Sequence, residues 1–154
     1  MYDLMIIGSG PAGISAALTA KARNLNFIWF GSRALSTKIE KAEKIMNYPG
    51  LPAVTGSEMQ SVFLKQIDDY GITITESQVN SIYDCGGYFA AGADNEIYEA
   101  KAVIMTVGMT TTREIEGEAR LLGCGVSYCA TCDGALYKLS LIHISEPTRR
   151  RGIS

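Results

Sequence analysis

The spacing of apolar residues divides the start of the chain into a strand, a helix and a second strand. Residues 4–7 and residues 25–30 are short apolar runs, and an alanine-rich stretch over residues 14–23 separates them. Continuous apolar runs of this length are typical of buried parallel strands. Asn24 is a plausible end for the helix. The sequence therefore predicts a strand–helix–strand unit at the amino end.

Two further helices are expected before the middle of the chain, each opened by a capping box, in which a Ser or Thr is followed three residues later by Glu. The capping-box pairs are Thr37 with Glu40 and Thr55 with Glu58. The first pair predicts a short helix over residues 36–46. The second predicts a longer helix that ends at Gly71, with an apolar face made of Met59, Val62, Phe63 and Ile67.

The rest of the first 108 residues has the alternation of apolar and polar positions that is typical of strands. The expected strands cover residues 72–75, 79–83, 88–91 and 97–100. Turn signals at Gly86-Gly87 and Asp94-Asn95 make the last three a small antiparallel β-meander. Residues 102–107 form another buried parallel strand, which ends at Gly108. We therefore expect an α/β fold, a parallel sheet with an added meander.

The turn between the first strand and the first helix carries the strongest motif. It reads Gly8-Ser9-Gly10-Pro11-Ala12-Gly13. In such a turn Gly8 permits the tight bend, Gly10 lets a pyrophosphate approach the backbone, and Gly13 lets the helix pack closely on the strand. The helix N-terminus also offers unpaired N–H groups to phosphates. The motif predicts a dinucleotide site, and the alternative is a purely structural glycine turn.

The loop after the second strand departs from the usual dinucleotide pattern. Where an NAD-type site has an acidic residue for the ribose hydroxyls, this chain has Gly31-Ser32-Arg33. Ser32 could still bond a ribose, and Arg33 could meet a 2′-phosphate, which would favour NADP. We prefer the interpretation of Arg33 as a solvated loop residue.

Composition narrows the class of protein. The chain has 154 residues, 47% of them hydrophobic, and a net charge of −2. These values suit one globular domain with a real core and do not suit a nucleic-acid-binding protein. No apolar run reaches the roughly 18 residues of a membrane span, and the first strand begins too early for a signal peptide. We expect a cytoplasmic protein.

A second motif is the pair Cys129 and Cys132, followed by Asp133. Two thiols separated by two residues can close a disulfide or exchange with one, and the carboxyl group can exchange the proton. A zinc half-site would need a second pair of ligands, and only Cys85 and Cys124 remain, neither in a pair. The spacing therefore favours redox chemistry and no metal site.

With these motifs in hand, residues 1–138 resemble the N-terminal half of a low-molecular-weight bacterial thioredoxin reductase. The resemblance depends on Gly8 to Gly13, Asn47-Tyr48-Pro49-Gly50, the strand ending at Gly108, and Gly125 to Gly134. It implies a Rossmann-like domain with FAD on the first glycine motif. The residues it implies for FAD are Gly8, Ser9, Gly10, Pro11, Ala12, Gly13, Gly31, Ser32, Asn47, Val79, Thr106 and Gly108.

The same resemblance implies roles for the second motif. Cys132 corresponds to the thiol that faces the flavin, Cys129 to the thiol that attacks the partner disulfide, and Asp133 to the acid. It also implies thioredoxin or a thioredoxin-like partner, a homodimer, and NADPH bound by the full-length protein outside this chain. The domain boundaries it implies are 1–113 for the FAD-binding domain and 114–138 for the start of the NADPH and redox-disulfide domain. Residues 139–154 resemble translated sequencing adapter, and we expect them to be non-native.

Two departures from this family leave the electron donor open. The family usually has Gly-Gly-Gln after the second strand, where this chain has residues 34–38, and it has Ala-Thr-Gly where this chain has Thr106-Val107-Gly108. The chain also resembles some clostridial-type relatives, which implies ferredoxin or another donor in place of NADPH, and a reductase of a peroxiredoxin system is a further alternative. A non-catalytic dinucleotide-binding or zinc-stabilised module is the alternative from another class.

Overall fold

A computed structural model describes residues 1–108 and 116–121 of the chain. The chain divides into two units, residues 1–109 and residues 110–154. In the second unit the described part holds one short helix, α4 (Glu118–Leu121). The N–H groups of Arg120 and Leu121 both donate to the carbonyl of Gly117, each at 3.1 Å.

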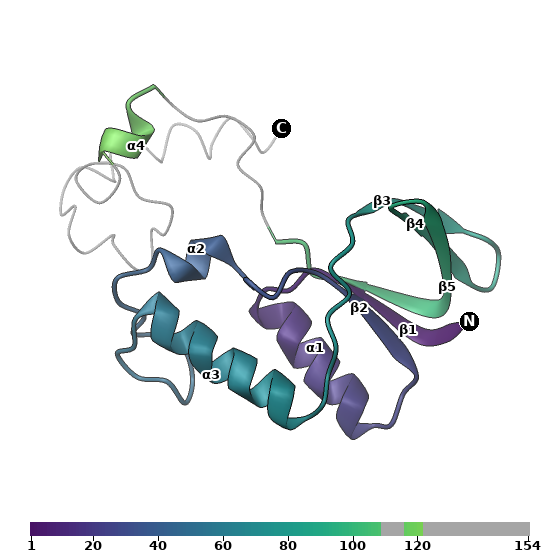
Figure 1. The fold of residues 1–154 in the computed structure, drawn as a ribbon, viewed down its shortest axis with the longest axis horizontal. Helices are drawn as coiled ribbons and strands as arrows, with labels where there is room; N and C mark the ends of the chain where they lie inside the picture. Colours follow the sequence, from purple (N-terminus) through teal and green to yellow (C-terminus); the bar gives the residue numbers. More distant parts are fainter. Residues whose placement is uncertain (109–115, 122–154) are drawn as a thin grey trace, which may run out of the picture. The chain divides into compact units, whose positions relative to one another are not determined.

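The first unit contains a five-stranded mixed sheet with the strand order β2-β1-β5-β4-β3 (Figure 1). Its strands are β1 (Tyr2–Ile7), β2 (Phe27–Phe30), β3 (Val79–Asp84), β4 (Phe89–Ala93) and β5 (Glu96–Met105). β1 is parallel to both β2 and β5, whereas β4 is antiparallel to both β5 and β3. The expected α/β fold with a parallel sheet and a β-meander is confirmed.

The long strand β5 corrects one expectation. Residues 97–100 and 102–107 were expected to be separate strands, but one strand runs from Glu96 to Met105. Ala100 pairs with Phe89 of β4 on one side and with Tyr2 of β1 on the other. The two sequence patterns arise because the first part of the strand belongs to the meander and the second part to the parallel sheet.

Two helices, α1 (Pro11–Ala22) and α3 (Gly56–Asp69), lie side by side against one face of the sheet (Figure 1). Alternate residues of β1 and β2 point to this face because side chains along a strand alternate between its two faces. The cluster that they form with the helices includes Leu4, Ile6, Trp29, Ile14, Ala17, Ala20, Met59, Phe63 and Ile67. This cluster is the main hydrophobic core.

The other face of the parallel strands is covered by the meander. The buried residues of this second core are Met5, Ile7, Ile28, Phe30, Ala91, Ala93 and Ala100. The members from β4 and β5 are all alanines, so their backbones can pack close to the larger side chains of β1 and β2. β1 and β2 are therefore buried on both faces, as their continuous apolar runs predict. The expectation that residues 102–107 form a buried strand is wrong for the end of β5, where Ile104 and Met105 are exposed.

The helix α3 confirms the second capping box. The Oγ1 of Thr55 accepts a hydrogen bond from the N–H of Glu58 at 3.2 Å, and Glu58 Oε2 accepts one from the N–H of Thr55 at 2.8 Å. The helix ends before Gly71, which has φ +59°. Of the four residues expected on its apolar face, Val62 is an exception, because it is 45% exposed.

The expected helix over residues 36–46 is largely wrong. Only α2 (Thr37–Glu40) forms, and its cap is Ser36, whose Oγ accepts a hydrogen bond from Ile39 N–H at 3.4 Å. Further along, Ile45 exchanges two backbone hydrogen bonds with Val54, at 2.7 and 3.2 Å. This pairing requires extended backbone and therefore excludes the helix there.

The expected strand over residues 72–75 is reduced to one bridge, in which Thr75 pairs in parallel with Phe30 of β2. Ile72 and Ile74 are nevertheless buried in the main core.

In the described part of the chain, no helix is both long enough and apolar enough to span a membrane.

Candidate functional site

The glycine motif lies at the carboxyl end of β1, between the sheet and α1. Gly8 has φ +112°, and a Cβ added to it would overlap the carbonyl oxygen of Thr106. A Cβ added to Gly13 would overlap the carbonyl oxygen of Gly8 and lie 2.9 Å from Thr106 Oγ1. These two glycines are therefore needed because other parts of the chain pack directly against them.

Gly10 differs from Gly8 and Gly13, because no other part of the chain that the structure describes packs against it. Its φ of −72° is accessible to any residue, and a Cβ added to it would meet no atom within 4 Å. No side chain caps α1 at this position, and Pro11 occupies the first turn. The surface over the helix N-terminus is therefore bare backbone with free space above it. This surface fits the close approach of a pyrophosphate.

Hydrogen bonds from neighbouring strands hold the turn in place. The carbonyl of Gly8 accepts a hydrogen bond from the indole Nε1 of Trp29 at 2.8 Å. The hydroxyl of Thr106 lies 3.0 Å from the same carbonyl and 2.9 Å from that of Ile7. The carboxyl ends of β1, β2 and β5 are thus joined at the motif, so the fold itself holds the backbone of the turn in place.

Ser9 connects the motif to the loop after β2. Its side chain is buried, and its Oγ accepts a hydrogen bond from the N–H of Ser32 at 2.9 Å and donates one to the carbonyl of Leu35 at 3.1 Å. A Cβ added to Gly31 would lie only 2.5 Å from Ser9 Cβ. The structure thus places Gly31 and Ser32 directly beside the glycine motif.

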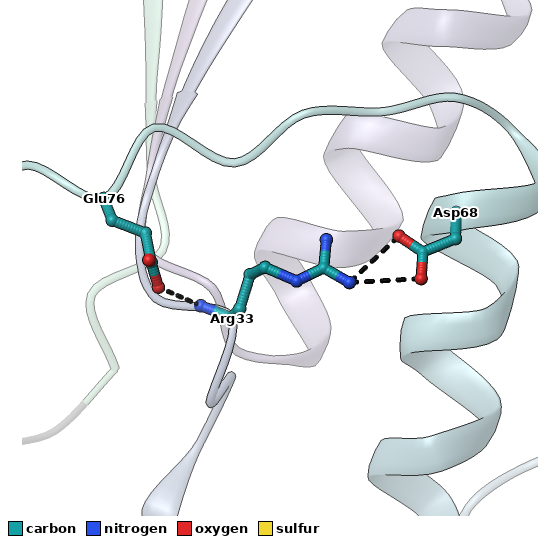
Figure 2. Close-up of polar contacts among 3 residues, drawn as sticks. All are labelled: Arg33, Asp68 and Glu76. Atoms are coloured by element: carbon teal, nitrogen blue, oxygen red, sulfur yellow. Dashed lines mark hydrogen bonds and ion pairs between the residues drawn. The ribbon is translucent and has the colours of Figure 1, made fainter.

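Arg33 extends from this loop toward α3 (Figure 2). Its Nη2 lies 3.0 and 3.1 Å from the two carboxylate oxygens of Asp68, and its backbone N–H donates to Glu76 Oε1 at 2.8 Å. The arginine side chain is half exposed, as expected for a loop residue, but its charge is paired. An exposed pair of this kind contributes at most about 1 kcal/mol. The guanidinium is nevertheless directed to Asp68.

The other residues expected at the site lie further apart in the fold. Asn47 is exposed in the segment between α2 and α3, Val79 begins β3 beside the second core, and Gly108 follows β5 with φ +67°. Within residues 1–108, no hydrogen bond joins these three to the glycine motif. Cys129, Cys132 and Asp133 lie outside the described residues.

Sequence reasoning missed two residues that matter here, Trp29 and Glu76. Trp29 gives no sequence signal for its hydrogen bond, since a tryptophan in an apolar run reads as core. Glu76 gives a weak signal, because it directly follows an alternating segment next to β2. Among the described residues, no cluster of three or more His, Cys, Asp or Glu side chains could hold a metal ion.

Comparison with known proteins agrees with this geometry. The family described as pyridine nucleotide-disulphide oxidoreductase matches residues 2–144. The thioredoxin reductase of Bacillus subtilis is 32% identical over 139 residues, which are 90% of this chain and 44% of that protein. The thioredoxin reductase of Mycoplasma genitalium is 35% identical over 140 residues, with the same shares.

Solved structures show the same likeness. A ferredoxin-flavin thioredoxin reductase from Clostridium acetobutylicum is 48% identical with a TM-score of 0.71, over 88% of this chain and 47% of that one. The thioredoxin reductase of Streptococcus pyogenes is 35% identical with a TM-score of 0.76, over 88% and 45%. The chain spans less than half the length of these relatives. Its sheet, its glycine motif and this family match together show that the chain belongs to the pyridine nucleotide-disulphide oxidoreductases.

Proposed function

We propose that this chain is the FAD-binding part of a thioredoxin reductase-type enzyme, which passes electrons through FAD to the pair Cys129 and Cys132 and on to thioredoxin. The observation that carries the proposal is the surface at Gly10, which is open, uncapped and held by hydrogen bonds from two strands. A purely structural glycine turn would not need a bare helix N-terminus with free space above it.

The chain's own residues would hold FAD through its phosphates and its adenosine. The N–H groups at the start of α1 would bind the pyrophosphate, and Ser32 would lie near the ribose. Asn47 and Val79 would contact the flavin and adenine ends, as the family resemblance implies. When bound, a flavin accepts a pair of electrons and delivers them to a disulfide. A nicotinamide delivers hydride, whereas a thiol pair reacts by thiolate attack, and a flavin can mediate between the two.

The proposed thiol chemistry belongs to the cysteine pair. The thiolate of Cys129 attacks the thioredoxin disulfide, a mixed disulfide forms, and the second thioredoxin sulfur leaves as a thiolate. Asp133 provides the proton for that leaving group. Cys132 then attacks the Cys129 sulfur of the mixed disulfide. This step releases the thioredoxin sulfur that had been bound to Cys129 and closes the disulfide between Cys129 and Cys132.

The comparisons favour ferredoxin over NADPH as the electron donor. The Clostridium acetobutylicum protein is named a ferredoxin-flavin reductase and is 48% identical, whereas the Streptococcus pyogenes thioredoxin reductase is 35% identical. Residues 34–38 also lack the Gly-Gly-Gln expected of the NADPH-dependent family. We therefore propose a ferredoxin-linked reductase first and an NADPH-linked one second.

For the 154-residue chain alone, we expect weak retention of FAD and no turnover with NADPH. At the carboxyl end of β5, Ile104, Met105 and Val107 are 39%, 63% and 60% exposed. Among the described residues nothing covers this flank of the site. Purified chain that stays yellow through gel filtration, or that reduces thioredoxin with NADPH, would contradict this expectation.

The thiol chemistry is tested by exchange with a thioredoxin whose buried cysteine is replaced and whose exposed cysteine carries thionitrobenzoate. The chain with Cys132→Ser keeps the attacking thiol, so it should release the yellow thionitrobenzoate anion and form a stable mixed disulfide. The variant Cys129→Ser should react at least tenfold more slowly, and Cys85→Ser, at an exposed turn position, serves as the control. Equal rates for the two CxxC variants would contradict the proposed roles.

A further inference from the structure

A carboxylate lies beside the place where the expected ribose-binding acid is missing. Thr75 pairs in parallel with Phe30, the last residue of β2, and its N–H donates to the carbonyl of Trp29 at 2.8 Å. The N–H of Gly31 in turn donates to Thr75 O at 3.1 Å. Gly31 and Glu76 each directly follow this bridged pair, and the N–H of Arg33 donates to Glu76 Oε1 at 2.8 Å, so Glu76 lies beside the loop after β2.

Position 31 itself cannot carry an acidic side chain in this chain. A Cβ there would lie 2.5 Å from Ser9 Cβ and 2.8 Å from Ser9 Oγ. Ser9 is buried and holds the loop through Ser32 and Leu35, so it cannot move aside without breaking those hydrogen bonds. The acid that dinucleotide sites place at the end of the second strand is therefore sterically excluded here.

Glu76 is free to take that place. It is exposed, and within residues 1–108 its carboxylate accepts one hydrogen bond, from Arg33 N–H to Oε1 at 2.8 Å. That bond fixes the carboxylate against the loop that follows β2 (residues 31–35, the ribose loop) and leaves Oε2 for a ligand. Figure 2 shows Glu76 at the backbone end of Arg33, while the guanidinium reaches in the other direction to Asp68. The carboxylate of Asp68 thus holds the guanidinium of Arg33 away from the carboxylate of Glu76.

We propose that Glu76 is the ribose-recognition residue of the site, accepting a hydrogen bond from a hydroxyl of the adenosine ribose. This inference rests on the proposed dinucleotide function and adds to it a residue outside both the glycine motif and β2. It also assigns a ligand class, an adenine nucleotide with free ribose hydroxyls. A 2′-phosphate would meet the negative charge of Glu76, and Arg33 is already paired.

The test measures binding of ADP and of 2′,3′-dideoxy-ADP to the ¹⁵N-labelled 154-residue chain by amide chemical-shift titration, which detects millimolar affinities. Wild type should bind ADP about tenfold more tightly than the dideoxy analogue, the ratio expected for one charge-assisted hydrogen bond. Glu76→Gln keeps an acceptor for Arg33 N–H but removes the charge, and should lose most of this ratio. Glu99→Gln makes the same change at an exposed site on β5 and should behave as wild type.

The other outcomes would refute either the role of Glu76 alone or the dinucleotide site as well. If wild type binds both nucleotides equally, or if Glu76→Gln keeps the tenfold ratio, the role of Glu76 is refuted while the dinucleotide site stands. If Glu76→Gln weakens both nucleotides by the same factor, Glu76 only shapes the loop and the inference is also wrong. If wild type binds neither nucleotide at millimolar concentration, the proposed dinucleotide function fails together with the inference.

Discussion

Replacing Gly13 by alanine tests the packing of the glycine motif, because two known effects oppose each other there. Gly13 lies in the first turn of α1, and alanine in a helix is favoured over glycine by up to about 1 kcal/mol. The added methyl group, however, would overlap the carbonyl oxygen of Gly8, and Thr106 Oγ1 lies within 2.9 Å of it. Overpacking of this kind costs about 1–3 kcal/mol. The obstacle is backbone of the same turn, so no rotamer change relieves it.

Because the obstacle is fixed backbone, we take the upper end of that cost, about 3 kcal/mol, and subtract about 1 kcal/mol for the better helix former. Gly13→Ala should therefore lower the free energy of unfolding by about 2 kcal/mol net, a fall in Tm of roughly 10 °C for a unit of this size. Urea unfolding followed by far-UV circular dichroism measures the change. Gly10→Ala is the matched control, since its methyl group meets no atom within 4 Å. There a weaker N-cap and a less flexible unfolded chain offset each other, so we expect a change within about 0.5 kcal/mol.

The two variants should separate stability from binding. Gly10→Ala should be as stable as wild type but should bind ADP weakly, because its methyl group occupies the space proposed for the pyrophosphate. A Gly13→Ala variant as stable as wild type would refute the packing argument. A Gly10→Ala variant with unchanged ADP affinity would refute the assignment of the phosphate surface.

Three further predictions concern polar contacts, each read from the urea midpoint. Ser9→Ala removes the buried hydroxyl that holds the ribose loop, and should cost about 1–3 kcal/mol, whereas Ser61→Ala on the exposed face of α3 should change stability by less than about 0.5 kcal/mol. Thr55→Ala removes the cap of α3 and should cost about 1 kcal/mol, and an unchanged midpoint would show that the capping box contributes nothing. Hydrogen bonding from Lys101 lowers the pKa of Asp3, so this carboxylate stabilises the fold fully above its unfolded pKa of about 3.9 and loses that effect as the pH falls through the lower folded value. The midpoints of wild type and Asp3→Asn should therefore differ by a constant amount above about pH 5 and converge as the pH falls below about 3.9, and a gap that does not change with pH would contradict this reasoning.

Local patterns predicted the elements whose neighbours lie close in sequence. The capping box at Thr55 and the end of α3 at Gly71 are set by residues within one turn, so sequence spacing is enough to find them. The same rule failed at Thr37, where Ser36 caps a helix of four residues. The reason is not local, because the pairing of Ile45 with Val54 takes the following residues into extended backbone.

In the candidate site, too, some features are set by local sequence and others by tertiary contacts. The glycine motif was readable because a strand, a turn and a helix must follow one another directly to build a phosphate-binding surface. Sequence analysis gave Gly8 the tight bend, Gly13 the close packing of the helix and Gly10 the approach of a ligand. The packing agrees, because Gly8 and Gly13 lie against backbone while Gly10 faces open space. The local pattern around Glu76 gives only a weak signal that it lies near β2, and its contact with Arg33 comes from the tertiary structure.

By itself, then, the sequence determined the kind of fold and the position of the glycine turn, since each depends on residues a few positions apart. Tertiary structure alone decided that one strand serves both the meander and the parallel sheet, that Ser9 excludes a side chain at position 31, and that Glu76 lies beside it. These features join residues that are tens of positions apart in the chain. Their distances are fixed by strand register and by packing in the core, which no local sequence pattern records.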